Sequence, residues 1–346
     1  MRIAIVGAGL SGMSLAYFLS KRSDVHKLEV YDKSYHLGGL LWQEDGADLG
    51  PHYIFGNQLA VTAILEDILD GEYKEAGHSK LCICSDGIVT GFPFQYNLQD
   101  HPSSEQIIHD YESNKPTPPI NLMEWFRSTF GNWMSGLNFE PYNTKMWDDK
   151  LPLLAANMSE RMESERDKIT NNKPYTMPTS YYPTSEYGIF EIIRKMYQKL
   201  EATGKFSFHP HNFFYVNRLP EEFRSYDYVV WTAPAYPTNN YQGVYLAQVK
   251  EDSDAEVVVN CQPDVQWHRK SQILTKPGWV QYESMTEMFD STFVPDAYPI
   301  PFRLKYKGKP EIDPKVNVVL HGRQGLAEYW NMDKCVLESM KLSAKL

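Results

Sequence analysis

Three glycines close to the amino terminus have the spacing that binds the pyrophosphate of a dinucleotide. Gly7 would permit a tight turn, Gly9 would let a pyrophosphate approach backbone N–H groups, and Gly12 would let a helix pack on the preceding strand. Asp32 lies twenty positions after Gly12, where its carboxylate would accept a hydrogen bond from a ribose hydroxyl. These residues predict a bound dinucleotide and leave NAD and FAD both open.

The elements around these glycines are the ones that such a site requires. A β-branched run, Arg2–Val6, precedes the turn, and apolar residues at helical spacing follow it. Lys27–Tyr31 alternates apolar and polar residues, which predicts a second strand ending at Asp32. This order of strand, helix and strand, over roughly thirty residues, predicts a Rossmann-like βαβ unit.

A second glycine pair, Gly38-Gly39, follows the predicted second strand, and Gly50-Pro51-His52 comes soon after it. This combination resembles the flavoprotein superfamily that includes the amine oxidases and the galactopyranose mutases. The resemblance favours FAD over NAD as the cofactor.

Four longer segments are similar to segments of one family in that superfamily, the UDP-galactopyranose mutases. They are Asp48–Phe55, Gly91–Asn97, Pro141–Trp147 and His321–Asp333, in the family's order. Trp267-His268-Arg269 and Ala297-Tyr298-Pro299 are shorter matches. Together the matches run from Gly7 to Asp333 and cover nearly the whole chain.

The resemblance implies roles for individual residues. At the reacting sugar and its diphosphate it places Arg269, Tyr298, Tyr329 and His52. Along the nucleotide-sugar channel it places Phe94, Gln95, Asn97, Tyr142, Trp147, Tyr181, Tyr182 and Asn331. At the cofactor it places Gly7, Gly9, Ser11, Gly12, Asp32, Lys33, Gly39, Leu40, His52, Arg323, Asn331 and Met332. Without the resemblance, Tyr142 and Trp147 would be interpreted as core residues of an aromatic-rich helix.

The activity that the resemblance implies is an isomerisation of UDP-galactopyranose, or a related nucleotide sugar, to its furanose form for cell-surface polysaccharides. In the family, N5 of reduced FAD attacks the anomeric carbon, UDP leaves, and the opened sugar recloses through O4. NAD(P)H is a candidate reductant. Two other interpretations stay open: a redox flavoenzyme of the amine oxidase or protoporphyrinogen oxidase type, and a non-catalytic flavin- or nucleotide-sugar-binding protein.

The sequence departs from the family at two places. The family carries a second arginine on a mobile loop, whereas Met177–Pro183 has none, and Arg161 and Arg166 are the candidate substitutes. Bacterial members often carry a second histidine where this chain has Phe55. Both differences bear on the substrate rather than on the fold.

Composition narrows the range of partners. A net charge of −10 argues against nucleic acid and anionic membranes, so an anionic ligand must be met by locally placed cations. The four cysteines fit neither a zinc pattern nor a disulfide framework, which predicts no metal site and a reducing cytoplasm. No apolar run is long enough to predict membrane insertion. A homo-oligomer is compatible with the sequence.

The expected fold class is α/β, with a Rossmann-like FAD-binding domain, an inserted helical subdomain and an antiparallel sheet subdomain. The FAD-binding domain is expected from residues 1–75, 189–243 and 313–346, the last with a carboxyl-terminal strand and helix. The sheet subdomain is expected from residues 76–100 and 244–312. Residues 101–166 are expected to be a helical substrate subdomain, and 167–188 a loop or lid rich in Asn, Pro, Thr, Ser and Tyr.

Overall fold

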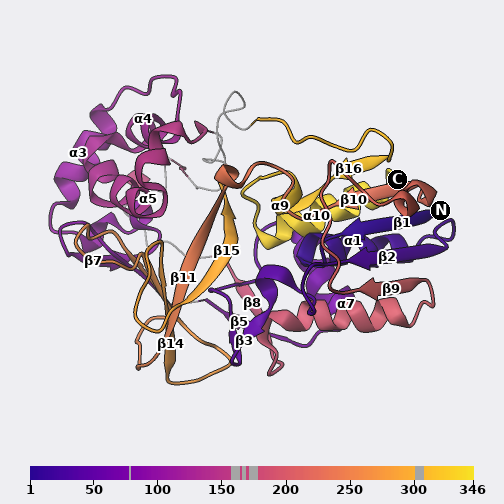
Figure 1. Ribbon diagram of the computed structural model, residues 1–346. Helices are drawn as coiled ribbons and strands as arrows, with labels where there is room; N and C mark the ends of the chain where they lie inside the picture. Colours follow the sequence, from indigo (N-terminus) through magenta and orange to yellow (C-terminus); the bar gives the residue numbers. More distant parts are fainter. Residues whose placement is uncertain (78, 157–163, 166–168, 171–177, 301–307) are drawn as a thin grey trace.

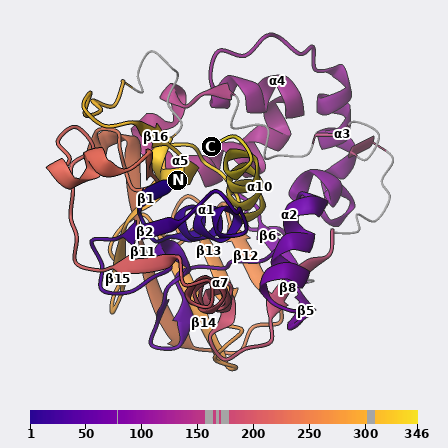
Figure 2. The same cartoon turned by 90° about the vertical axis from the view of Figure 1, so that its right-hand side faces the viewer.

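The computed structural model describes residues 1–346 except 78, 157–163, 166–168, 171–177 and 301–307. Two sheets organise the described chain, and Figure 1 shows a parallel sheet with its helices on the right and a longer sheet beneath a group of helices on the left. The two ends of the chain lie near each other beside the parallel sheet in Figures 1 and 2.

The first sheet has five strands, and all of its pairs are parallel. In sheet order they are β16 (Val318–Leu320), β10 (Tyr228–Trp231), β1 (Arg2–Val6), β2 (Lys27–Tyr31) and β9 (Phe206–His209). The central β1 is buried from Ile3 onward, as expected for a parallel strand covered on both faces. The carboxyl ends of β1, β2 and β10 meet at one edge, which is where ligands of such sheets bind. The predicted Rossmann-like fold is confirmed.

Three helices pack around this sheet: α1 (Leu10–Ser20), α7 (Glu191–Glu201) and α10 (Met332–Ser343). Helix α1 contacts both α7 and α10 and is buried along almost its whole length, whereas α7 buries one apolar face. Figure 2 views α1 and α10 nearly end-on and shows them side by side. The predicted terminal helix from Met332 is present.

The second sheet has seven strands. In sheet order they are β15 (Thr292–Pro299), β11 (Tyr241–Lys250), β14 (Trp279–Ser284), β13 (Arg269–Gln272), β12 (Val257–Asn260), β6 (Lys80–Ile83) and β7 (Val89–Gly91). The sheet is mixed rather than purely antiparallel, because β6 pairs with β12 in parallel. Strand β6 is far from β12 in the sequence, and periodicity within one strand carries no information on such a pairing.

Helices α3 (Ser104–Ser113), α4 (Leu122–Met134) and α5 (Glu140–Trp147) lie over one part of the second sheet (Figure 1). The rings of Phe126, Phe130 and Phe139 stack within the core that these helices share with the sheet. Trp147 ends α5 and is 1% exposed. The helices therefore fix the position of Trp147 above the sheet.

One strand forms inside the stretch predicted as a loop. Strand β8 (Ser180–Pro183) pairs antiparallel with β5 (Tyr73–Ala76) and is anchored by the buried Tyr182. Residues 167–168 and 171–177 of the expected lid lie outside the described residues, as do Arg161 and Arg166. Further short elements include β3 (Gln43–Glu44), β4 (Ala47–Asp48), α2 (Gln58–Thr62) and α9 (Gly322–Gly325), besides several single turns of 3-10 or π helix.

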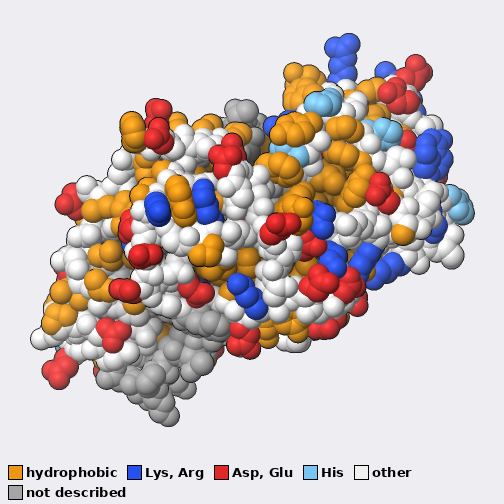
Figure 3. All heavy atoms as spheres, turned by 90° about the horizontal axis from the view of Figure 1, so that it is seen from below, with side chains coloured by type: hydrophobic (Ala, Val, Ile, Leu, Met, Phe, Trp, Pro, Cys, Tyr) orange, Lys and Arg blue, Asp and Glu red, His pale blue; other side chains and the backbone are white. Residues whose placement is uncertain are grey.

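The surface carries charges of both signs. Figure 3 shows acidic and basic side chains interspersed over one face of the molecule, so the net charge of −10 is not gathered there. Among the described residues, every helix is too short or too polar to cross a lipid bilayer.

Candidate functional site

The glycine turn between β1 and α1 combines two glycines that the fold needs with one at which a side chain would fit. A Cβ atom on Gly7 would lie 2.4 Å from Thr232 Oγ1, and one on Gly12 would lie 1.9 Å from the carbonyl oxygen of Gly7. The backbone at Gly7 also has a positive φ of 111°. A Cβ on Gly9 would first meet the carbonyl oxygen of Gly38, at the ordinary contact distance of 3.8 Å. The fold itself therefore tolerates a side chain at Gly9, and the glycine fits a ligand that lies in front of the turn.

Helix α1 offers its amino terminus to that space. Gly9 is its N-cap and no side chain caps it, and its first turn contains no acidic residue. The second glycine pair closes the opposite side, because the backbone of Gly38 bridges to Gly9 and a Cβ on Gly39 would lie 3.3 Å from Gly9 Cα. Uncapped N–H groups at the start of α1, set between two glycine backbones, fit the pyrophosphate of a dinucleotide such as FAD.

Asp32 lies at the end of β2, next to the turn. Its carboxylate accepts hydrogen bonds from the backbone N–H groups of Ala8, at 2.7 Å, and Ser34, at 2.8 Å. The carboxylate is thereby fixed beside the turn at Gly7–Gly12 and the facing pair Gly38-Gly39, which together we call the cradle. Lys33 follows Asp32 and is exposed, and Leu40 is half-buried in the short helical turn after Gly39.

The carboxyl-terminal segment packs against this cradle. A Cβ on Gly322 would lie 2.4 Å from Cβ of Ser11, so Gly322 allows α9 to approach α1 closely. Asn331 is the N-cap of α10, and Met332 begins that helix. The next residue after Gly322 is Arg323, which connects the cradle to the second sheet.

Arg323 Nη2 donates to the carbonyl oxygen of Ala297 at 2.8 Å, and Nη1 donates to that of Trp330 at 3.2 Å. Its guanidinium carbon lies 4.8 Å from the ring centre of Tyr329 and 5.8 Å from that of Tyr298. Arg323 thus brings a fixed positive charge to two tyrosines that the sequence assigned to the substrate.

The aromatic wall of this region is formed by Trp147, Tyr298 and Tyr329. The ring of Trp147 lies edge-on to both tyrosines, with centroids 6.2 Å from Tyr298 and 5.9 Å from Tyr329. These residues come from α5, β15 and the segment after α9, so the fold gathers them from distant parts of the sequence.

Arg269 stands beside this wall on β13. Its Nε donates to Glu283 at 2.7 Å, and its Nη2 donates to the hydroxyl oxygen of Tyr298 at 3.0 Å. Tyr298 also donates to the carboxylate of Glu283. Burial alone would raise the pKa of Glu283, but Arg269 outweighs it and holds that pKa at about 2. The Arg269 side chain keeps 25% exposure, so part of the guanidinium faces outward.

His52 lies near both arginines. Burial, with Arg323 and Arg269 as additional causes, lowers the pKa of His52 to about 4. Its Nδ1 lies 3.1 Å from the carbonyl oxygen of Gly50. His52 is therefore an uncharged hydrogen-bonding group at neutral pH.

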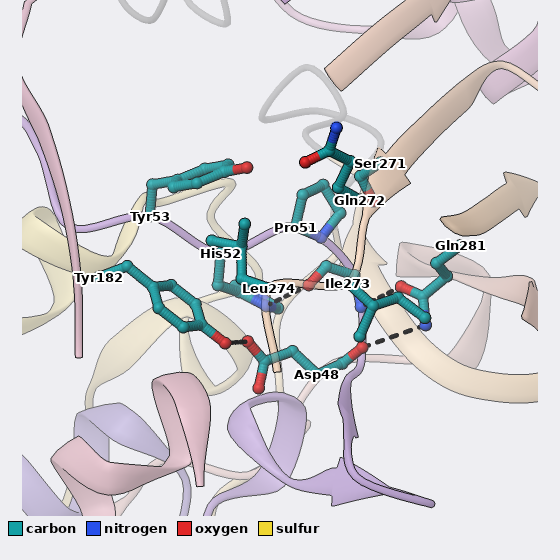
Figure 4. Close-up of a pocket in the computed structure, with 11 residues that line it drawn as sticks. Asp48, Pro51, His52, Tyr53, Tyr182, Ser271, Gln272, Ile273, Leu274 and Gln281 are labelled. Carbon is teal, nitrogen blue, oxygen red and sulfur yellow. Dashed lines mark hydrogen bonds between the residues drawn. The ribbon is translucent and has the colours of Figure 1, made fainter. Parts of the chain in front are cut away.

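Figure 4 shows the surroundings of His52, where Tyr182 points at the Asp48 carboxylate and Gln281 reaches the backbone of Asp48. The Tyr182 hydroxyl donates to Asp48 at 2.6 Å, and the backbone N–H of Gly50 donates to Gln281 at 2.8 Å. The cavity between them has about 20 Å³, which holds roughly one water molecule and no sugar.

Several predicted substrate residues lie outside the group around Trp147. Tyr182 is engaged with Asp48, and Tyr181 packs edge-on against Tyr73 at 5.3 Å. Phe94 is 1% exposed in the core beneath the helices, and Asn97 donates to the carbonyl oxygen of Pro93 at 2.8 Å. Gln95 is also buried. In the described chain these five residues pack against, or hydrogen-bond to, other parts of the protein, and they do not join the group around Trp147.

Three residues of the site were missed by the sequence assignments: Glu283, His268 and Lys145. Glu283 and Gln281 are buried on the same face of β14, so two polar residues at period two were the available signal. Lys145 Nζ donates to the carbonyl oxygens of Asn260 and Trp267, at 3.2 and 3.1 Å. It ties α5 to the chain that leads into Arg269.

A group of potential metal-ligating side chains lies in another part of the molecule, and its histidine already makes hydrogen bonds within the protein. Suitable atoms of Cys84, Asp86 and His101 lie within 4.8 Å of one another. His101 Nε2 lies 3.0 Å from Asp86, and its Nδ1 accepts from the backbone N–H of Ser103 at 3.1 Å. Both ring nitrogens thus serve the loop, and we assign these residues a structural role.

Comparison with known proteins agrees with this geometry at the level of the fold. Residues 5–68 match the family model of the NAD(P)-binding Rossmann-like domain. No curated protein matches the chain. A solved structure of reduced UDP-galactopyranose mutase is similar at 18% identity and a TM-score of 0.78, over 99% of this chain and 93% of the other.

Two oxidase structures are similar as well. A protein from Exiguobacterium sp. described as a protoporphyrinogen oxidase has 12% identity and a TM-score of 0.66, over 99% of this chain and 98% of the other. A putrescine oxidase variant has 12% identity and a TM-score of 0.61, over 99% and 98%. The chain has the fold that the mutase and the two oxidase structures share.

Proposed function

We propose that this protein is a flavin-dependent isomerase that converts UDP-galactopyranose, or a related nucleotide sugar, to its furanose form. The observation that carries the proposal is the juxtaposition described above: a pyrophosphate cradle at Gly9 is joined through Arg323 to a group that contains Arg269, Tyr298, Tyr329 and Trp147. The similarity to a UDP-galactopyranose mutase structure supports the same proposal.

The cofactor proposed for the cradle is FAD, held by the turn at Gly9, by the amino terminus of α1 and by Asp32. When bound in its reduced form, FAD supplies a nucleophile at N5. NAD(P)H is the proposed reductant. His52 carries no charge at neutral pH, so it can hydrogen-bond near a flavin without adding a positive charge.

The remaining residues act on the diphosphate and the sugar. Arg269 and the hydroxyl of Tyr329 would donate hydrogen bonds to the diphosphate as it departs and returns. Tyr298 and Glu283 would hold Arg269 in place beforehand, because the Tyr298 hydroxyl accepts from Arg269 and donates to Glu283. Preorganised donors of this kind stabilise developing negative charge more than mobile water does. Trp147 and Tyr329 would form a wall along which the sugar changes shape while the nucleotide stays bound.

A redox flavoenzyme is the second candidate, favoured by the oxidase structures that share the fold. A single experiment separates the two. The FAD-loaded protein is incubated without oxygen with UDP-galactopyranose and an amount of dithionite far below that of the substrate, and the furanose product is measured by chromatography.

An isomerase regenerates its reduced cofactor, so many turnovers per reducing equivalent are expected. The oxidised protein should be inactive in the same assay. Product that follows the reductant or oxygen one for one would contradict the isomerase and favour the oxidase.

A further inference from the structure

A negative charge stands inside the group proposed to bind a diphosphate. Glu283 is 2% exposed, and its carboxylate accepts from Arg269 Nε at 2.7 Å and from the Tyr298 hydroxyl. A diphosphate that approaches Arg269 therefore meets a carboxylate that already shares this guanidinium. Like charges in a buried site repel strongly, so the site needs a way to offset the excess.

His268 lies next to that carboxylate. Its side chain is completely buried, and Nε2 is 3.5 Å from Glu283 Oε1. Within the described chain neither ring nitrogen has a hydrogen-bond partner. The ring packs edge-on to Tyr142, with centroids 5.7 Å apart. Nε2 of this buried imidazole already faces the carboxylate and Nδ1 has no partner, so the ring is placed to take up a proton and pair with Glu283.

We propose that Glu283 and His268 form a couple that takes up one proton from solvent when a diphosphate ligand binds at Arg269. The inference rests on the proposed function, since that function supplies the diphosphate. The proton would reside on His268 Nε2, and the imidazolium would pair with the Glu283 carboxylate. Arg269 would then be shared with the ligand at a smaller electrostatic cost.

The charged groups around the Glu283–His268 couple determine whether ligand binding strengthens or weakens as pH rises. The titratable groups that face the couple are Arg269, Lys145, His52, Tyr142, Tyr298 and Tyr329. In the free protein burial lowers the pKa of His268, so the ring is neutral at pH 7. A bound anion favours the protonated ring and raises this pKa. Proton uptake then makes binding tighter at low pH and weaker as pH rises.

The test is calorimetric titration of the oxidised, FAD-loaded protein with UDP-galactose at pH 7, in two buffers whose ionisation enthalpies differ. UDP-galactose is chosen because its diphosphate is a diester with no ionisation near this pH. The difference between the two apparent enthalpies gives the number of protons taken up. We expect a value approaching one, and a Kd that rises by up to about tenfold per pH unit between pH 6 and pH 8.

Two variants locate the proton. In His268→Gln and in Glu283→Gln the uptake should fall to zero and the Kd should become independent of pH. Glu283→Gln is neutral like the protonated couple, so it should bind UDP-galactose at pH 8 more tightly than the wild type does. His26→Gln, at an exposed histidine in another part of the chain, is the matched control and should keep the wild-type uptake.

The outcomes are distinguishable. Binding of UDP-galactose by the wild type without proton uptake would overturn the couple and leave the proposed function standing. Uptake that persists in both variants would place the proton on another group and also overturn it. Failure of the oxidised wild type to bind would overturn the couple, and the isomerase assay on the reduced protein would then decide the proposed function separately. If a variant does not fold, an absence of proton uptake in the wild type still overturns the couple.

Discussion

Arg269 is held between a carboxylate and a hydroxyl while a quarter of its side chain remains exposed. Removing one charge-assisted donor from a closed site costs about 2–4 kcal/mol of transition-state stabilisation. For Arg269→Ala we therefore expect kcat/KM to fall by about one and a half to three orders of magnitude with the FAD content unchanged. The measurement is isomerase activity together with flavin absorbance.

The Arg269→Ala change also leaves Glu283 buried without its cation, which destabilises the fold by itself. The double variant with Glu283→Gln removes that charge and isolates the effect on activity. Arg127→Ala breaks an exposed ion pair with Glu140 and serves as a control that should turn over normally. Normal turnover of Arg269→Ala would exclude Arg269 as a diphosphate ligand.

Gly9 is the glycine at which loss of the cofactor can be separated from loss of the fold. Its φ of −76° suits any residue, and an added Cβ would meet no atom closer than 3.8 Å. Gly9→Val should therefore fold but fill the space proposed for the pyrophosphate, so the purified protein should lack the 450 nm flavin absorbance. The control Gly136→Val adds a side chain where no neighbour lies within 4 Å and should stay yellow. A yellow Gly9→Val would contradict the proposed cradle.

At the residue scale, the sequence predicted residues that belong to a recognisable motif. It missed residues that join the site only through contacts between strands distant in the sequence. Gly7, Gly9, Gly12 and Asp32 follow a short local pattern, and they lie together around one turn. Glu283 becomes part of the site only because β13 and β14 are neighbours in the sheet. No pattern within either strand specifies that pairing.

Among the elements, the junction of β4 and β8 depends on a buried acid. Burial raises the pKa of Asp48 to about 6, although Tyr182 donates a hydrogen bond that opposes the shift. Between pH 4 and pH 6 the folded chain keeps this proton while the unfolded chain has lost it, so the contribution of Asp48 to stability falls as pH rises through that window. Above pH 6 the buried charge of Asp48 lowers the free energy of unfolding by a constant amount.

Asp48→Asn keeps an oxygen that can accept from Tyr182 and carries no charge. We expect it to raise the free energy of unfolding at pH 7 by about 1–3 kcal/mol, with the gain shrinking toward zero at pH 4. Urea denaturation at several pH values measures this. Asp45→Asn, in the exposed turn between β3 and β4, is the control. A gain that does not change with pH would show that the charge of Asp48 is not its source.

Elements with a strong period of their own were predicted where they occur, as β2 and α10 illustrate. The strand β8 was missed because Pro178 and Pro183 flank its tyrosines and suggest a loop, whereas pairing with β5 decides the conformation. Tertiary pairing outweighs local preference in short segments of this kind.

In the whole molecule, the proposed FAD contacts come from both ends of the chain. The turn at Gly9 and the loop at His52 belong to the first part of the sequence, whereas Arg323 belongs to the last. The family-level resemblance predicted this convergence through the order of its segments. Periodicity and composition did not predict this convergence. Periodicity describes one segment at a time, and composition is an average over the chain, so neither says which distant segments meet.

A ligand held by such dispersed segments binds only the folded chain, so its binding free energy adds to the stability of the whole. At an FAD concentration 100 times its Kd the gain is about 2.7 kcal/mol, which for a chain of this size raises the Tm by roughly 3–5 °C. We expect the FAD-free wild type to show this rise when FAD is added, and Gly136→Val to show it equally. Gly9→Val should keep one Tm at all FAD concentrations. If Gly9→Val were stabilised as much as the wild type, FAD would bind elsewhere, and the link between the cradle and the group at Arg269 would lose its basis.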